Sequence, residues 1–537
     1  MSTDTASAGP PLTPAQKIAG GYAIAGPALE LGSVVVDGAA DPAAHVRIPL
    51  ATINRHGLVA GATGTGKTKS LQVVAEQLSA AGVPVLMADV KGDLSGLSLP
   101  GAPGDKIAQR ATDTGDDWTP TAYPVEFLSL GTSGTGVPIR ATITSFGPIL
   151  LSKVLGLNAT QESTLGLIFH WADQQGLPLL DLKDLRSVIQ FLTGDEGKPQ
   201  LKALGAVSPT TAGVILRALV NLEAEGADTF FGEPELRPED LMRVDAQGRG
   251  IISLLELGNQ AARPVMFSTF LMWVLADLFT FLPEVGDIEK PKLVFFFDEA
   301  HLLFTDASKA FLEQVEQTVK LIRSKGVGVF FCTQLPTDIP SNVLSQLGAR
   351  IQHALRAFTP DDQKALNKTV RTYPKTDVYE LESALSSLGI GEAIVTVLSE
   401  RGAPTPVAWT RMRAPKSLMD TIGPDAISAA AKASPLQAEY GQTIDRDSAY
   451  ERLAAKLASP PPPVAAPAPP SAPADLPPVP QQWDIPPMPA PAQREEPGML
   501  DKVMASPAFK SAMRSAGTVI GREITRSIFG TGKRRRR

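Results

Sequence analysis

Short apolar runs of strand length alternate along much of the chain with segments whose apolar residues recur at helical spacing, and this alternation predicts an α/β core. Short apolar runs in HGLVAG, PVLMADVKGD and KLVFFFDEAH have the length of buried strands. The stretch TKSLQVVAEQLSAAG instead carries its apolar residues at helical spacing and closes on Gly82. Strands that alternate with helices form mostly parallel sheets covered on both faces. We therefore expect a doubly wound sheet.

The same patterns divide the chain into seven segments. Helical spacing dominates one long central stretch, which predicts an all-helical insertion within the α/β core. The run SPPPPVAAPAPPSAPADLPPVPQQ is too rich in proline and alanine to form a packed core and is typical of an extended linker. In order, we expect a short N-terminal β portion at 1–50, the first part of the core at 51–144, the helical insertion at 145–245, the second part of the core at 246–415, a helical extension at 416–458, the Pro/Ala-rich linker at 459–497 and a basic amphipathic C-terminal helix and tail at 498–537.

One apolar stretch, PVMFSTFLMWVLADLFTFLP at 264–283, is nearly long enough to span a bilayer. It contains Asp277, however, and it ends a few residues before another predicted strand. A charge inside a membrane is strongly penalised. We therefore expect a buried core helix rather than a transmembrane segment.

The composition fits a soluble protein of a reducing compartment. Of the 537 residues, 43% are hydrophobic and 20% are charged. The N-terminal residues contain no apolar run of the kind that marks a secretory signal. The single cysteine, Cys332, excludes an intrachain disulfide framework. It lies in the apolar run VGVFFCTQ, which predicts a buried strand residue rather than a nucleophile. We expect a cytoplasmic location.

Charge is distributed unevenly along the chain. Residues 498–537 carry ten Lys and Arg against two acidic residues, a net charge of +8. The remainder carries 40 basic and 54 acidic residues, a net charge of −14. An acidic body argues against a broad nucleic-acid-binding surface, although it leaves room for a local basic pore or loop.

The stretch GATGTGKT at 61–68 fits the phosphate-binding pattern G-x-x-x-x-G-K-[ST]. Its glycines let successive backbone N–H groups face a phosphate chain. Lys67 would reach the β- and γ-phosphates, and the Thr68 hydroxyl would bind Mg²⁺. The predicted cofactors are therefore ATP and Mg²⁺. The predicted nucleotide-binding residues are Gly61, Ala62, Thr63, Gly64, Thr65, Gly66, Lys67, Thr68 and Lys69.

A second motif, KLVFFFDEAH, supplies the carboxylates that a nucleotide site needs. Five apolar residues at 293–297 run directly into Asp298 and Glu299. At the carboxyl end of a buried strand, Asp298 is placed to bind the Mg²⁺ shell together with Thr68. Glu299 is placed to orient or deprotonate the attacking water. This pair of acidic residues predicts hydrolysis rather than binding alone.

Two further strand ends carry polar candidates. Gln334 ends the strand VGVFFCTQ, where it would contact the γ-phosphate and report its presence. In ADVKGD, the residues Asp89, Lys91 and Asp93 fall on the same sheet edge as the nucleotide. For Asp89 two interpretations remain open, namely a second carboxylate for the metal or water, and a solvated strand end.

Taken together, these motifs resemble the HerA/FtsK group of P-loop ATPases, and most strongly its bacterial HerA-like branch. The stretches that carry the resemblance within residues 15–415 are RHGLVAGATGTGKT, ADVKGD, FFFDEAH, RSKGVGVFFCTQLPTDIPSNVLSQLGARIQHALR and GEA. The resemblance implies a RecA-like core, a homo-hexameric ring and ATP bound between subunits. It also implies an arginine from the neighbouring subunit, which would be Arg323 in IRSKGVGV. Arg350 and Arg356 are weaker candidates for the same role, the stabilisation of charge in phosphoryl transfer.

HerA-like motors translocate on double-stranded DNA, often with a nuclease partner, so the resemblance implies DNA and an accessory protein as partners. Here the portion before the core is only about 50 residues long, too short for a long N-terminal barrel at about 5–6 residues per strand. The five histidines are scattered, and the sequence shows no nuclease constellation. Two alternatives stay open, an ATP-gated assembly that does not move along a polymer, and an ATPase recruited to a membrane through its tail.

The basic C-terminal segment has its own pattern. Small and apolar residues recur there at every fourth position, and they include a G-x-x-x-G pair of the kind found where helices pack closely. Three hypotheses compete with a merely solubilising tail: docking on the protein's own ring, binding to an anionic membrane and binding to nucleic-acid phosphates. The glycines favour docking, since glycine is a poor helix former unless close contact compensates. The recurring residues are Met513, Gly517, Gly521, Thr525 and Phe529, and the interleaved basic residues are Lys510, Arg514, Arg522 and Arg526.

Overall fold

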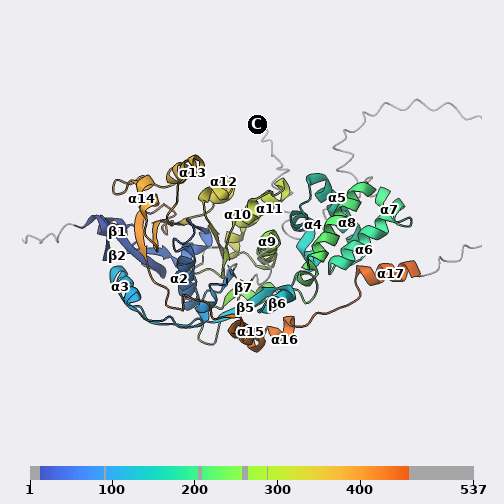
Figure 1. The fold of residues 1–537 in the computed structure, drawn as a ribbon, viewed down its shortest axis with the longest axis horizontal. Coiled ribbons are helices and arrows are strands. Elements are labelled where there is room, and N and C mark those ends of the chain that lie inside the picture. The colour runs from blue at the N-terminus through green and yellow to red at the C-terminus, as the bar shows by residue number, and fades with distance from the viewer. Residues whose placement is uncertain (1–11, 90–91, 204–207, 257–263, 287, 459–537) are drawn as a thin grey trace, which may run out of the picture.

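The computed structural model describes residues 12–89, 92–203, 208–256, 264–286 and 288–458. Within them, the chain forms one long sheet with helices against it, and a group of helices that stands to one side (Figure 1). The predicted linker at 459–497 and the predicted basic helix and tail at 498–537 lie outside the described residues.

Twelve strands of the described residues form the sheet, in the order β2-β1-β12-β11-β10-β3-β9-β8-β4-β7-β5-β6. From β10 to β6 all neighbouring strands are parallel, whereas β2, β1, β12 and β11 are added to this part in antiparallel fashion. The prediction of a mostly parallel sheet is confirmed. The strands are β1 (Ala28–Val36), β2 (Ala39–Pro49), β3 (Gly57–Ala60), β4 (Val85–Asp89), β5 (Val125–Leu130), β6 (Val137–Ile139), β7 (Ile252–Glu256), β8 (Leu293–Phe297), β9 (Val327–Thr333), β10 (Ala349–Gln352), β11 (Glu392–Thr396) and β12 (Ala408–Met412).

The helices outside the insertion include one that the sequence pattern did not predict. This helix, α1, begins the N-terminal portion, which was expected to be β structure. Thr13 and Gln16 form a reciprocal capping box, and Pro14 takes the first helical position, where its missing N–H costs nothing. These helices are α1 (Pro14–Gly20), α2 (Lys67–Ala80), α3 (Asp105–Thr114), α9 (Pro264–Phe281), α10 (His301–Phe304), α11 (Lys309–Ile322), α12 (Ser341–Leu344), α13 (Pro360–Val370) and α14 (Leu381–Ser387).

The continuous apolar run of β8 reflects a strand that is covered on both faces. Val294 and Phe296 belong to the same cluster of buried side chains as α2, whereas Phe295 and Phe297 belong to the cluster that contains α9 and α11. Successive side chains of a strand point to opposite faces. Because a helix covers each face, every side chain of β8 is buried.

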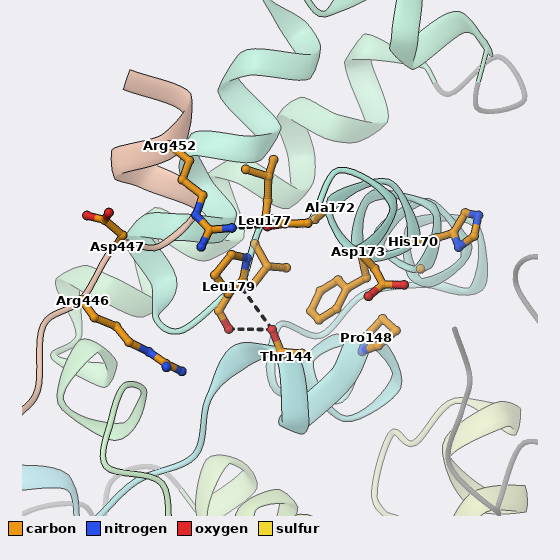
Figure 2. A pocket seen from close by; sticks show the side chains of 14 residues that line it. Thr144, Pro148, His170, Ala172, Asp173, Leu177, Leu179, Arg446, Asp447 and Arg452 are labelled. Atoms are coloured by element: carbon orange, nitrogen blue, oxygen red, sulfur yellow. Dashed lines mark hydrogen bonds between the residues drawn. The ribbon is translucent and has the colours of Figure 1, made fainter. Parts of the chain in front are cut away.

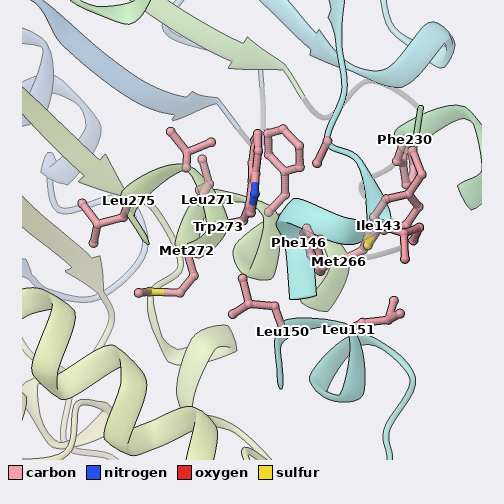
Figure 3. Packing of buried hydrophobic residues seen from close by; sticks show 14 of the residues in the cluster. Ile143, Phe146, Leu150, Leu151, Phe230, Met266, Leu271, Met272, Trp273 and Leu275 are labelled. Atoms are coloured by element: carbon pink, nitrogen blue, oxygen red, sulfur yellow. The ribbon is translucent and has the colours of Figure 1, made fainter. Parts of the chain in front are cut away.

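The apolar stretch at 264–283 contains α9, and most of its described side chains are buried inside the protein. Trp273 and Met272 belong to the same cluster of buried side chains as Phe146 and Leu150 of the insertion (Figure 3). Asp277 is half-buried, and burial together with the charges of nearby glutamates raises its pKa to about 6. The prediction of a core helix is confirmed. Among the described residues, no helix has the length and apolar character that a bilayer crossing requires.

The insertion is a group of helices beside the sheet, shown in green and teal in Figure 1. Asn158 caps α5, Asp181 caps α6 and Ser208 caps α8, each through a side-chain oxygen that accepts a backbone N–H. Beyond α8 the chain reverses at Gly226, which has a positive φ of 82°, and it continues in short 3₁₀ turns, the second of which begins at Pro238. The helices are α4 (Ile143–Val154), α5 (Ala159–Gln174), α6 (Leu182–Thr193), α7 (Lys198–Ala203) and α8 (Pro209–Ala224).

The segment after β12 joins the core to the insertion. Residues 413–423, which we call the strap, contain no helix and cross over α2; the predicted helical extension at 416–458 begins within them. Three helices follow, α15 (Pro424–Ala433), α16 (Gln437–Tyr440) and α17 (Ala449–Ala458). The last of them packs against α6, so the described chain ends on the insertion (Figure 1).

Candidate functional site

The phosphate-binding loop connects β3 to the first turn of α2, as its sequence predicts. Gly61, Gly64 and Gly66 have φ angles of 151°, 77° and 109°. These backbone conformations favour glycine and direct N–H groups inward. The Lys67 ammonium folds back on the loop and donates to the carbonyls of Gly61 at 2.6 Å and Ala62 at 3.1 Å. The ammonium of Lys67 therefore lies where the phosphates of a bound nucleotide would take over from these two carbonyls as its hydrogen-bond acceptors.

The carboxylates of the second motif lie at the same edge of the sheet. Asp298 follows the last residue of β8, and its carboxylate accepts the backbone N–H of Glu299 at 2.9 Å. Glu299 has a positive φ of 47°, which is uncommon for a residue with a side chain. One of its carboxylate oxygens lies 3.3 Å from Nδ1 of His301. Such backbone strain is typical of functional sites.

Cys332 shows that the two motifs meet. It lies on β9, the strand between β3 and β8, and is fully buried. Burial raises the pKa of its thiol well above the ordinary value, and a hydrogen bond to Asp298 acts in the same direction, while the charge of Lys67 opposes it. Lys67 and Asp298 therefore both affect the pKa of the same buried thiol, so the two motifs lie close to it and to each other. The prediction of a structural cysteine agrees with this position.

Gln334 follows β9 at the same edge, and its side chain is exposed. The turn that carries it is fixed by Asp338, whose carboxylate accepts the Thr333 hydroxyl at 2.7 Å and the Leu335 N–H at 3.0 Å. The carbonyl of Thr333 in turn accepts the N–H of Gly61 at 3.2 Å. Gln334 thus stands on a rigid turn beside the phosphate loop.

Arg323 lies at the opposite edge of the sheet. It ends α11 and precedes β9, which runs parallel to β3 and away from Arg323 toward the phosphate loop. Its side chain is exposed, and its charge acts on His56, the residue before β3. Arg350 donates to the carbonyl of Thr372 at 3.3 Å, and Arg356 is exposed just after β10. The structure therefore separates Arg323 from the other predicted site residues of its own chain.

Asp89 lies at the end of β4, but its carboxylate is already used. It accepts the N–H groups of Gly92 at 2.7 Å, Asp93 at 3.1 Å and Leu94 at 3.1 Å. Burial raises its pKa to about 6 although these hydrogen bonds oppose the rise. Asp89 is buried, so it is not the solvated strand end of the second interpretation, and its carboxylate holds its own loop; a role at the metal or water stays a prediction. Lys91 lies outside the described residues.

Lys69 turns away from the phosphate loop toward the strap. Its ammonium donates to the carbonyl of Met419 at 2.8 Å. On the same face of α2, Gln72 donates to the carbonyl of Leu418 at 2.9 Å, and the buried Glu76 accepts the N–H of Ser417 at 3.0 Å. Three residues of α2 thus bind one extended segment of the chain. The first of them directly follows the predicted metal ligand Thr68.

The comparison with protein families agrees with this geometry. A family model described as "Helicase HerA-like C-terminal" matches residues 35–537. The chain belongs to this family. It is an ATPase of the HerA/FtsK type, as its motifs predict.

Solved structures of low sequence identity are similar to this HerA-like chain. The plasmid coupling protein TrwB, in complex with the ATP analogue ADPNP, is 16% identical over 75% of this chain and 94% of its own, with a TM-score of 0.50. VirB4 of Thermoanaerobacter pseudethanolicus is 13% identical over 73% of this chain and 98% of its own, with a TM-score of 0.45. No curated protein matches the chain.

The structure adds a site residue that the sequence analysis missed, His353. It follows β10, is fully buried, and donates its backbone N–H to the carbonyl of Ala60 at 2.7 Å. A Cβ atom on Gly61 would lie 2.5 Å from the Cβ of His353, so only glycine fits there. Nδ1 of His353 lies 2.8 Å from the carbonyl of Glu392, and Nε2 lies 3.0 Å from the Ser70 hydroxyl. The available signal was a polar residue at a strand end, the same signal that pointed to Gln334.

Proposed function

We propose that this HerA-like ATPase hydrolyses Mg²⁺-bound ATP in a hexameric ring and uses the cycle to move along double-stranded DNA. The position of Arg323 is the observation that supports a ring. Its exposed side chain stands at the amino edge of the sheet, whereas Lys67 and Asp298 stand at the carboxyl edge. In this arrangement Arg323 completes the site of a neighbouring copy. An arginine supplied in this way accelerates phosphoryl transfer by about 10³–10⁵-fold in related systems.

The residues at the carboxyl edge fit a magnesium nucleotide. Thr68 and Asp298 would hold Mg²⁺, which supplies positive charge to the β- and γ-phosphates. Lys67 would exchange its two loop carbonyls for phosphate oxygens. Glu299 would take the proton of a water whose oxygen bonds to the γ-phosphorus while the bond from that phosphorus to the bridging oxygen of ADP breaks. Gln334 would contact the γ-phosphate beside it.

Exposed apolar side chains beside the site support assembly with a second copy. Ile390 is 77% exposed, and the next residue, Gly391, donates its N–H to the carbonyl of Thr65 in the phosphate loop. Phe358 is 84% exposed on the segment that follows His353. A large apolar side chain beside a site is stabilised when a neighbouring subunit covers it. We also propose a cytoplasmic location, for which the single buried cysteine is the argument.

The test is the ATPase rate with and without double-stranded DNA, at low and at moderate salt. Glu299→Gln serves as the blank, and the chain truncated after Ala458 is measured alongside the full chain. We expect stimulation by DNA that weakens steeply with salt, because phosphate contacts release counterions. An ATPase rate that DNA leaves unchanged in both forms would contradict translocation on DNA.

A second candidate is an ATP-gated assembly that docks an accessory protein and does not move along a polymer. The observation in its favour is the net charge of −14 outside residues 498–537, which disfavours a broad contact with DNA. In that case nucleotide would change the mass of the assembly in sedimentation, while DNA would change neither the mass nor the rate.

A further inference from the structure

A cavity separate from the nucleotide site lies between the insertion and the last described residues. It has a volume of about 890 Å³ and is bounded by α4, α5, the turn that follows α5, and residues 446–452 (Figure 2). This volume lies within the range of roughly 300–1,000 Å³ that is typical of ligand sites. None of the predicted nucleotide-binding or catalytic residues lines it.

The cavity has an apolar floor and a charged rim. Leu179 is buried and Phe169 and Leu177 are half-buried on the floor, whereas Asp173 and Asp447 are exposed on the rim. In Figure 2, Asp173 lies on the α5 side of the lining residues and Asp447 lies on the side of residues 446–452. The described residues provide no ion pair for either carboxylate. A ligand that fits this shape is apolar and flanked by positive charge.

The two arginines at the rim are already engaged within the protein. Arg452 donates to the carbonyl of Gly176, and Arg446 pairs with Glu233 at 2.6 Å. These contacts fasten residues 446–452 to the insertion. They leave the negative charges of Asp173 and Asp447 as the free charges of the rim.

The chain itself contains a segment with the matching chemistry. Residues 518–529, TVIGREITRSIF, combine branched apolar side chains with Arg522 and Arg526. They belong to the tail at 498–537, whose net charge is +8. The insertion at 145–245 has eight Lys and Arg against fourteen Asp and Glu, a net charge of −6. Opposite net charges draw two such segments together over distances of about 10 Å at physiological salt.

Chain connectivity allows this tail to reach the cavity. The described chain ends with α17, which carries Arg452 on the cavity wall and ends at Ala458. The 39 residues of the proline-rich linker, at about 3.1 Å per extended residue, reach up to roughly 120 Å. The tail can therefore reach the cavity of its own chain and that of a neighbouring copy.

We propose that the basic tail of this chain docks in the cavity of the insertion. The apolar side chains of 518–529 cover the floor, and Arg522 and Arg526 approach the carboxylates of Asp173 and Asp447. The proposal does not depend on ATP hydrolysis. The docked tail would contact residues 446–452, which follow the strap in the chain. The strap in turn is bound by Lys69, Gln72 and Glu76 of the nucleotide-binding helix α2.

Disulfide trapping in the full chain tests the docking, since the only native thiol is buried at Cys332. The test pair is Asp173→Cys with Arg522→Cys. The control pair is Lys202→Cys with Arg522→Cys, because Lys202 is equally exposed on α7 and does not line the cavity. We expect the test pair to oxidise at least about ten-fold faster, because docking raises the effective concentration of the two thiols. A bond between two chains supports docking in a neighbouring copy, and one within a chain supports docking in the same copy.

A charge reversal on the rim provides the second arm. Asp447→Lys lies at an exposed position, so it leaves the fold intact, and it should slow trapping of the test pair by about three- to five-fold, which is the effect of one partly screened charge. Equal rates for the test and control pairs would overturn the proposal. If the rates are equal and slow, and anionic phosphatidylglycerol vesicles or duplex DNA bind the tail, then the tail binds a membrane or DNA instead of the cavity.

Discussion

Nε2 of His353 lies 3.0 Å from the hydroxyl of Ser70, at the first turn of the nucleotide-binding helix. The other ring nitrogen faces the carbonyl of Glu392, which can only accept a hydrogen bond, so Nδ1 carries the proton and Nε2 accepts from Ser70. Burial lowers the pKa of His353 to about 4 and keeps the ring neutral. His353 therefore positions the phosphate loop without adding charge to it.

Removal of this hydrogen bond should weaken nucleotide binding. Ser70→Ala leaves the buried Nε2 without a donor, at a cost of about 1–3 kcal/mol. We expect part of that cost to appear as a three- to ten-fold loss of ATP affinity, on the order of 1 kcal/mol, measured by calorimetry on the Glu299→Gln background. The matched control is Ser79→Ala, at the far end of α2, where the hydroxyl donates to the carbonyl of Gly250. Equal affinities in the two variants would show that His353 only stabilises the fold.

Glu299 should control turnover rather than binding. Glu299→Gln keeps the size of the side chain and removes the proton acceptor, so kcat should fall by about 10²–10⁴-fold while ATP still binds. Glu313→Gln on α11, an exposed position, is the control and should leave kcat unchanged. If turnover persists in the Glu299 variant, another group takes the proton.

Asp277 on α9 should make the stability of the fold depend on pH. Its folded pKa is about 6 against an ordinary value of 3.8, so ionisation is disfavoured in the folded state. The resulting destabilisation is absent below pH 3.8, grows as the pH rises to 6 and is constant above it. After allowance for partial exposure, Asp277→Asn should raise the free energy of unfolding by about 1–2 kcal/mol at pH 7.5 and by less at pH 4.5. Chemical denaturation at the two pH values measures this, with the exposed Asp228→Asn as control, and a pH-independent gain would contradict it.

The strap should detach when its buried acceptor is removed. Glu76 accepts the N–H groups of Lys416 at 2.9 Å and Ser417 at 3.0 Å, and burial raises its pKa. Glu76→Ala leaves these donors unpaired, and we expect a loss of about 2–4 kcal/mol. Hydrogen exchange should accelerate at 416–418 and remain unchanged in β9. Unchanged exchange in the strap would mean that the neighbouring loops alone hold it.

The central strands and the nucleotide motifs were predictable because each depends on local sequence. The apolar run of β8 shows a strand buried on both faces, and the glycines at 61, 64 and 66 take the positive φ angles that their pattern implies. The contacts of His353 were not predictable, because they join residues separated by 283 positions, and only the parallel pairing of β10 with β3 brings them together.

The strap illustrates the same limit. Its sequence, RAPKSLMDTIG, carries no strong helical or strand period, and its conformation is set by acceptors and donors on α2. Arg323 is a different case, since its motif marked it as functional but one chain cannot show which site it serves. The structure adds only that Arg323 lies at the edge of the sheet opposite the phosphate loop of its own chain.

The most direct test of the account mixes two inactive variants. Lys67→Ala removes the phosphate contact, and Arg323→Ala removes the arginine that a neighbour is proposed to supply. If each site takes its arginine from the adjacent copy, mixed assemblies contain interfaces with an intact loop on one side and an intact Arg323 on the other. We expect mixing to restore a measurable fraction of the wild-type ATPase rate, while each variant alone remains inactive. A mixture that stays as inactive as its components, in assemblies shown to exchange subunits, would contradict the shared site.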